Sequence, residues 1–134
     1  MNTMQPLVLI IEDDADLGKL YAKMVQIEQG TAELCADGLE ALARLEKNPV
    51  PDLFVIDLHL PGANGEEILK AARADPRFIQ TIMIVVTVDP EWARRLGTQH
   101  VADAVLLKPV EFSIYSRYIN LARKRALEKH QEVS

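Results

Sequence analysis

Five short apolar runs, each followed by a stretch with helical periodicity, constrain the fold of this chain more than any other feature of its sequence. The runs lie at Leu7–Ile11, Thr31–Ala36, Leu53–Ile56, Thr81–Val86 and Ala104–Leu107. The first, third and fourth runs are apolar at successive positions, as strands must be in a sheet that is covered on both faces. We therefore expect these three runs to be central strands of a parallel sheet.

The segments that follow the runs carry apolar residues at the spacing of one helix face. The expected helices are marked by Leu17, Leu20, Tyr21, Met24 and Ile27; by Leu39, Ala41, Leu42 and Leu45; by Ile68, Leu69 and Ala72; by the segment from Pro90 to about Gln99; and by Phe112, Tyr115, Ile119, Ala122 and Ala126. Regular alternation of strand and helix implies right-handed crossovers. The predicted class is α/β, a five-stranded parallel sheet with helices on both faces in a doubly wound (βα)5 order.

Length and charge narrow the class of protein. A chain of 134 residues builds one compact core, so we expect a single domain over residues 1–134, with a core of about 7–125 and no output domain in this chain. The net charge of −5 argues against nucleic acid or an anionic membrane as the main partner. Cys35 is the only cysteine, and we expect it to be a buried apolar residue in a reducing compartment. The first residues lack a basic segment and acids soon follow, which argues against a signal peptide or membrane span and for a cytoplasmic protein.

Acidic residues follow two of the expected central strands. Glu12, Asp13 and Asp14 come directly after the first run, and Asp57 follows the third. Either group alone has an ordinary explanation, because acids commonly cap helices and occupy turns. If the two strands are neighbours, however, the carboxylates converge at one edge of the sheet, where parallel sheets bind ligands. Converging carboxylates without a histidine or cysteine cluster favour a hard cation, Mg²⁺ or Mn²⁺, over zinc.

Two further polar residues end the remaining apolar runs. Thr87 follows the fourth run, and Lys108 follows the fifth. Each alone is an ordinary strand or surface residue. Acids, a hydroxyl and a lysine on four strand ends are less easily explained by coincidence, and together they favour a common site.

The residues at these positions resemble the signature of response-regulator receiver domains of two-component (phosphorelay) signalling. The resemblance rests on Glu12-Asp13, the segment Asp57 to Gly65, Thr87, Leu106-Leu107-Lys108-Pro109 and the segment Cys35 to Leu42, and it spans roughly Leu7 to Arg125. It implies a flavodoxin-like receiver fold and a phosphorylation-dependent signalling switch with Mg²⁺ (or Mn²⁺) as cofactor. It also implies that the chain is not an enzyme in the usual sense, since such domains promote only their own phosphorylation and dephosphorylation.

The same resemblance implies the role of each acid. Asp57 would accept the phosphoryl group. Asp13, Asp57 and the backbone carbonyl of His59 would bind the metal directly, and Glu12 would act through water. Asp14 resembles a variable position and is not expected to be a ligand.

The resemblance likewise assigns the other strand ends. Lys108 would pair with a phosphoryl oxygen, Thr87 would hydrogen-bond another and report occupancy, and Pro109 would follow a cis peptide bond. The implied phosphodonor is a histidine kinase or a histidine phosphotransfer protein. The signal would leave through the fourth helix, fifth strand and fifth helix to a protein that the sequence does not identify, and a homodimer formed on phosphorylation is compatible with this scheme.

The sequence departs from the family near its fifth strand. Val105 occupies the position where receivers usually have a tyrosine or phenylalanine that turns inward with the threonine, and the glycine expected near Val101 is missing. The chemistry at Asp57 is unaffected. The sequence does not show, however, how a change at Thr87 would reach the surface made by the fourth helix, fifth strand and fifth helix. Trp92 is a candidate substitute aromatic, although packing is the preferred explanation for it.

Two other functions are compatible with parts of the pattern. A metal-dependent aspartyl-phosphate phosphohydrolase would need a second acid two residues after its nucleophile, where this chain has His59. A receiver-like scaffold working without phosphorylation is favoured only by Val105. The basic residues Arg117, Arg123, Lys124, Arg125 and Lys129 are expected on a solvated helix face, and His59, His100 and His130 are expected to be exposed.

Overall fold

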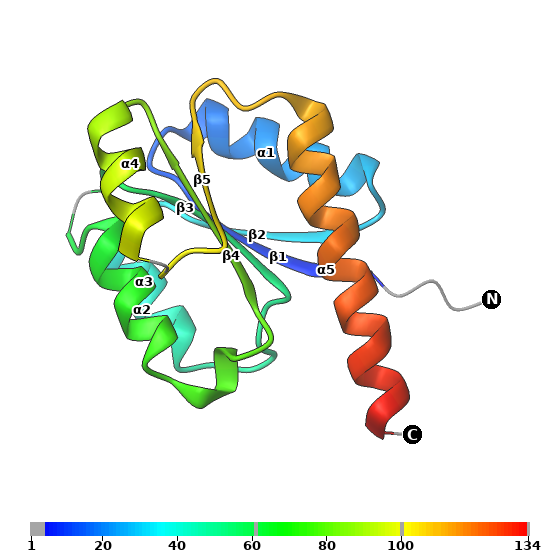
Figure 1. The fold of residues 1–134 in the computed structure, drawn as a ribbon. Coiled ribbons are helices and arrows are strands. Elements are labelled where there is room, and N and C mark those ends of the chain that lie inside the picture. The colour runs from blue at the N-terminus through cyan, green and yellow to red at the C-terminus, as the bar shows by residue number, and fades with distance from the viewer. Residues whose placement is uncertain (1–4, 61, 100, 134) are drawn as a thin grey trace.

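The computed structural model describes residues 5–60, 62–99 and 101–133, with side chains at 5–60, 62–95 and 101–129. Its five strands form one parallel sheet in the order β2-β1-β3-β4-β5 (Figure 1). The strands are β1 (Leu7–Ile11), β2 (Thr31–Cys35), β3 (Leu53–Asp57), β4 (Ile82–Thr87) and β5 (Ala104–Leu107). The helices are α1 (Ala15–Ile27), α2 (Gly38–Leu45), α3 (Gly65–Arg73), α4 (Pro90–Gln99) and α5 (Phe112–Val133).

The predicted alternation and fold class are confirmed. Four strand boundaries differ by one residue from the predicted runs: β2 ends at Cys35, β3 ends at Asp57, and β4 begins at Ile82 and ends at Thr87. A short 3-10 helix at Pro76–Phe78 was not predicted. These differences lie at element ends, where apolar patterns carry little information about the last hydrogen bond.

The two faces of the sheet carry two separate apolar cores, which explains why the central strands are apolar throughout. Helices α2 and α3 cover one face, and α1 and α5 cover the other (Figure 1). Alternate residues of each strand serve opposite cores, so that Leu9 and Ile11 pack beneath α2 and α3 while Val8 and Ile10 pack beneath α1 and α5. A central strand in this arrangement has no face left for polar residues until it ends.

Three helices begin at capping residues in the loops that follow the strands. The side chains of Asp14, Asp37 and Asn64 accept hydrogen bonds from the amides of Leu17, Glu40 and Glu67. Such caps satisfy amides that have no partner within the helix. They fix where each helix starts, and so they set the length of the loops at the carboxyl edge of the sheet.

Some apolar residues on the predicted helix faces are exposed. Leu20, Ile27 and Leu39 are 47%, 61% and 66% exposed. The buried stripe of α1 runs through Gly18, Tyr21 and Val25, at spacings of three and four residues, and the exposed residues lie off such stripes. Cys35 is buried, as predicted.

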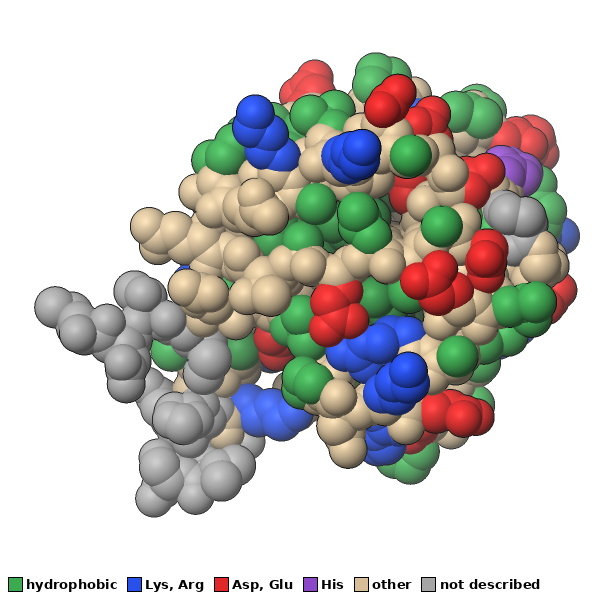
Figure 2. Space-filling model, turned by 180° about the vertical axis from the view of Figure 1, so that it is seen from behind, with side chains coloured by type: hydrophobic (Ala, Val, Ile, Leu, Met, Phe, Trp, Pro, Cys, Tyr) green, Lys and Arg blue, Asp and Glu red, His purple; other side chains and the backbone are tan. Residues whose placement is uncertain are grey.

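Charged side chains are distributed unevenly over the surface. Seen from behind, acidic side chains gather toward the right of the molecule (Figure 2). On α5, Arg117, Lys124 and Lys129 are exposed as predicted. Arg123 and Arg125 instead donate hydrogen bonds to the backbone carbonyls of Glu28 and Gln80, because their long side chains reach back to neighbouring loops. Within the described residues, no helix is long and apolar enough to cross a membrane.

Replacement of Gly38 by alanine is expected to destabilise the fold by about 1–3 kcal/mol. A Cβ at this position would lie 1.7 Å from the carbonyl oxygen of Ala63, and backbone cannot give way as a flexible side chain can. Gly18→Ala, within α1, is the matched control, since its Cβ would lie 3.6 Å from the side chain of Leu34. There the better helix propensity of alanine should stabilise the protein by up to about 1 kcal/mol. Urea denaturation of both variants measures the difference, and equal destabilisation would contradict this account of Gly38.

Candidate functional site

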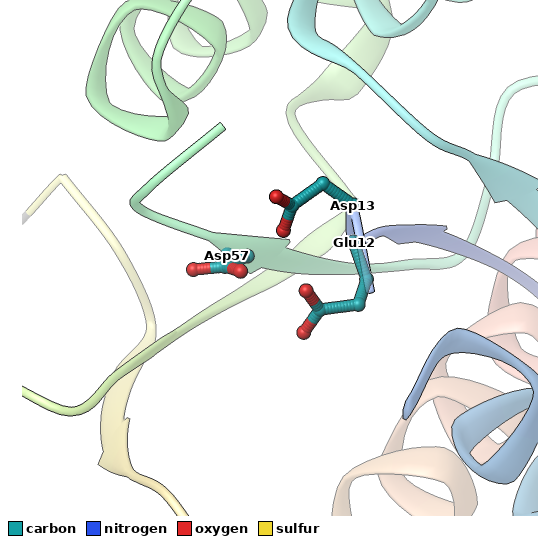
Figure 3. Close-up of side chains that lie close together, drawn as sticks. All are labelled: Glu12, Asp13 and Asp57. Carbon is teal, nitrogen blue, oxygen red and sulfur yellow. The ribbon is translucent and has the colours of Figure 1, made fainter. Parts of the chain in front are cut away.

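The predicted convergence of carboxylates occurs at the carboxyl edge of the sheet. Strands β1 and β3 are hydrogen-bonded neighbours. The direction of the strand order changes between them, since β2 lies on the outer side of β1 and β4 on the outer side of β3. Glu12 and Asp13 follow β1, Asp57 ends β3, and their carboxylates point toward one another (Figure 3). One carboxylate oxygen from each of the three lies within 4.8 Å of the others. Glu12 and Asp57 are buried, whereas Asp13 is exposed and gives the cluster an opening to solvent.

Lys108 supplies the positive charge of the site. It follows β5, and its Nζ lies 2.9 Å from Glu12 Oε1 and 3.2 Å from Asp57 Oδ2. Its amide donates to the Thr87 carbonyl at 2.9 Å, which fixes the start of the loop that carries it. The next peptide bond, Lys108–Pro109, is cis, in agreement with the prediction for Pro109. Residues from both ends of the chain therefore meet in one ion-pair network.

Thr87 ends β4 and is fully buried. Its Oγ1 accepts a hydrogen bond from the amide of Asp89 at 3.1 Å. The Asp89 carboxylate in turn accepts from Glu91, in the first turn of α4. Sequence reasoning missed Asp89, although an aspartate directly before Pro90 is a typical signal for a helix start.

Burial and charge shift the protonation of this network. The pKa of Glu12 is raised to about 7, mainly by burial and also by the nearby Asp57, while the hydrogen bond from Lys108 acts in the opposite direction. Burial by itself lowers the pKa of Lys108, but hydrogen bonds and charges from Glu12 and Asp57 outweigh it, so that this pKa lies above its usual value. Lys108 is consequently a permanent cation at neutral pH.

The remaining predicted residues lie around this centre. Asp14 caps α1 and does not join the three-carboxylate cluster. His59 has an exposed side chain, and its amide donates to Asp57 Oδ1 at 3.0 Å. The predictions for His100 and the His130 side chain fall outside the described residues.

Two residues near the fourth and fifth strands bear on the route of a signal. Val105 pairs with Val85 in the sheet and packs, partly buried, on the core beneath α2 and α3. Trp92 packs against the same core, which agrees with the preferred packing explanation.

The donor set suits a hard divalent cation. The three clustered side chains offer only carboxylate oxygens, the ligands that Mg²⁺ prefers, and the exposed Asp13 leaves room for bound water. Lys108 lies on the Glu12–Asp57 side of the cluster, where it would neutralise an anion that approached the same centre. The arrangement is therefore chemically suited to holding a cation and a phosphoryl group side by side.

Comparison with known proteins identifies the family. The model of the response regulator receiver domain matches residues 8–118. The chain is 31% identical over 109 residues to the DNA-binding response regulator MtrA of Mycobacterium bovis, covering 81% of this chain and 46% of that protein. It is 33% identical over 120 residues to the sensory transduction protein RegX3 of Mycolicibacterium smegmatis, covering 90% and 49%. The chain thus spans about half the length of these curated relatives.

Solved structures agree. The signal receiver domain of a putative Luxo repressor protein from Vibrio parahaemolyticus is 27% identical and has a TM-score of 0.80. The match covers 98% of this chain and 99% of that domain. The chain belongs to the response-regulator receiver family, whose members act in phosphorylation-dependent two-component signalling.

Proposed function

We propose that this chain is a switch in which Asp57 accepts a phosphoryl group from a phosphohistidine of a histidine kinase or phosphotransfer protein. The observation that carries the proposal is the meeting of three carboxylates with Lys108 beside the end of β4. The Asp57 carboxylate oxygen would attack phosphorus as the P–N bond breaks. The bond's electron pair would leave with the imidazole, and an acyl phosphate would remain on Asp57.

Neutralisation of charge is the main task of the surrounding residues. Lys108 already contacts Asp57, and after the transfer its ammonium group would pair with a phosphoryl oxygen. Thr87 would donate its hydroxyl to another oxygen. Asp13, Asp57 and the His59 carbonyl would hold Mg²⁺ (or Mn²⁺), with Glu12 acting through water, and the bound ion would offset negative charge on the phosphoryl oxygens.

The output would be a change on the surface made by α4, β5 and α5, read by a partner protein or by a second copy of this chain. Thr87 supports this route, because its hydroxyl binds the amide of Asp89 at the start of α4. A phosphoryl group shifts such an equilibrium only by interacting differently with the two states. In the unphosphorylated state the Thr87 hydroxyl binds the amide of Asp89, and in the phosphorylated state it would bind a phosphoryl oxygen. This change of partner is one such difference.

Acetyl phosphate or phosphoramidate with Mg²⁺ is expected to add one phosphoryl group to the chain, at Asp57. Asp57→Asn should remain unmodified, because Asp57 is the carboxylate that the proposal assigns as acceptor: its Oδ2 contacts Lys108 and its Oδ1 accepts from the amide of His59. Intact mass with hydroxylamine treatment, which cleaves acyl phosphates, measures the product.

Asp14→Asn is the matched control for this experiment, because asparagine keeps the helix cap while one nearby negative charge is lost. It should be modified like the wild type. Equal modification of Asp57→Asn and wild type would disprove the assignment of the acceptor, and absence of modification in the wild type would favour the unphosphorylated scaffold.

A further inference from the structure

The start of α4 is held by the residue that ends β4. The amide of Asp89 donates to Thr87 Oγ1 at 3.1 Å, and the Asp89 carbonyl accepts from Ala93 at 3.1 Å. The Asp89 carboxylate accepts from the amide of Glu91 at 3.0 Å. A displacement of the Thr87 hydroxyl would therefore remove one hydrogen bond from the residue on which the first turn of α4 is built.

Trp92 lies one turn further along α4 and faces the loop that follows Asp57. It is partly buried against the core, and with Leu58, His59, Asn64 and Glu66 it lines a small hollow of about 80 Å³. The same loop begins at Asp57, whose carboxylate accepts from the His59 amide. Trp92 is thus in contact range of the segment that carries the acceptor while it belongs to the helix that begins beside Thr87.

Arg95 ties this tryptophan to α3. Its guanidinium carbon lies 3.8 Å from the centre of the Trp92 ring, and its Nη2 lies 3.1 Å from Glu66 Oε2 in the first turn of α3. The Glu66 side chain is only 16% exposed. Arg94, the neighbouring residue, pairs instead with Glu91 on α4 itself, and both of those side chains are more than three-quarters exposed. The Arg95 ion pair joins two helices, whereas the Arg94 ion pair stays within one.

We propose that Trp92, Arg95 and Glu66 form a latch that holds α4 against α3 in the unphosphorylated state, and that a phosphoryl group on Asp57 opens it. The inference rests on the proposed function and names a device that regulates the same site. When the Thr87 hydroxyl turns to the phosphoryl group, Asp89, the residue before α4, loses its hydrogen bond to Thr87. The latch is then the contact that resists movement of α4. Because binding and conformation are linked reciprocally, a weaker latch must strengthen binding of the phosphoryl group.

Trp92 also provides the signal for a test, because it is the only tryptophan of the chain. Beryllofluoride with Mg²⁺ serves as the phosphoryl mimic. When the protein is saturated with beryllofluoride, the fluorescence emission of Trp92 should change, since its ring leaves the contacts with Arg95 and the β3–α3 loop. Binding is measured separately by isothermal titration calorimetry, which does not depend on the tryptophan.

The decisive comparison is Arg95→Gln against Arg94→Gln. Loss of the cation–π contact and the helix-to-helix ion pair should tighten beryllofluoride binding about fivefold in Arg95→Gln, while Arg94→Gln stays within about 1.5-fold of wild type. Equal affinities for the two variants, weaker binding by Arg95→Gln, or unchanged Trp92 emission at calorimetric saturation would overturn the latch. Phosphorylation of Asp57 alongside any of these results would leave the proposed function standing, whereas failure of the wild type both to bind the mimic and to be phosphorylated would refute both.

Discussion

Asp13→Asn and Lys108→Ala are each expected to slow phosphorylation of Asp57 by acetyl phosphate about 10²–10³-fold. Lys108 is the cation that contacts both buried carboxylates, at 2.9 and 3.2 Å. Without it the transferring group approaches Glu12 and Asp57 without the positive charge that contacts both carboxylates. Asp13 is the exposed member of the cluster, and its loss should weaken binding of the divalent cation. The rate is measured by intact mass over time at saturating Mg²⁺.

Asp14→Asn is the control for Asp13→Asn, because it removes the same charge one residue away. Asp14 accepts from the Leu17 amide as the cap of α1, and asparagine caps equally well. We expect its rate to stay within about threefold of wild type, as for an exposed charge outside a site. A larger loss from Asp14→Asn than from Asp13→Asn would show that the acidic run is assigned one residue out of register. Thermal melts of each variant with Mg²⁺ establish that the protein is folded.

Without a divalent cation, the free energy of unfolding should fall by about 3 kcal/mol as pH rises from below 4.5 to above 7. Burial raises the pKa of Glu12 to about 7, from an ordinary value of 4.5 that applies to the unfolded chain. Between these values the folded state binds more protons than the unfolded state. Stability must therefore decrease with rising pH through this window. Lys108 lies outside it, because its pKa is raised above 10.5.

Mg²⁺ should restore much of this stability at neutral pH. A cation that binds only the folded state stabilises it by about 2.7 kcal/mol at one hundred times its dissociation constant. The comparison is made by thermal melts with Mg²⁺ and with EDTA across the pH window. A metal-free protein that is more stable at pH 8 than at pH 5 would contradict the burial of an ionisable Glu12.

Asp57→Asn should make the metal-free protein more stable at neutral pH, by about 1–2 kcal/mol. Asp57 has two acidic neighbours, Glu12 and Asp13, with one oxygen of each carboxylate within 4.8 Å of the others, and one cationic neighbour, Lys108, at 3.2 Å. Removing its charge therefore relieves more repulsion than the attraction it costs. It also leaves Lys108 to neutralise Glu12 alone. Asp14→Asn serves again as the control, and a metal-free Asp57→Asn that melts below wild type would show that these carboxylates do not repel one another in the fold.

The sequence predicted the fold well because strands of a doubly covered sheet must be apolar at every position. Leu7–Ile11 and Leu53–Ile56 could be recognised from that requirement alone, and the sheet then places the residues after these strands at one edge. Glu12, Asp13 and Asp57 were therefore predicted to meet before any distance was known. Element ends were predicted less well, since the last residue of a strand is decided by one hydrogen bond, as at Thr87.

The individual side-chain pairs formed between distant segments could not be predicted. The pairing of Lys108 with Glu12, 96 positions apart, and of Arg95 with Glu66 depends on side-chain directions that follow from packing. The pKa of Glu12 likewise depends on burial, which a run of acids does not reveal.

Taken by itself, the sequence determined the class of fold, the edge of the sheet that carries the polar residues, and the kinds of ligand atom available there. Only the tertiary structure decided which of these residues touch, which carboxylates are buried, and that Trp92 of α4 lines a hollow with the loop after Asp57. The physical reason is that apolar periodicity is a local property of the chain, whereas charge pairing and desolvation are set by neighbours brought together from remote positions.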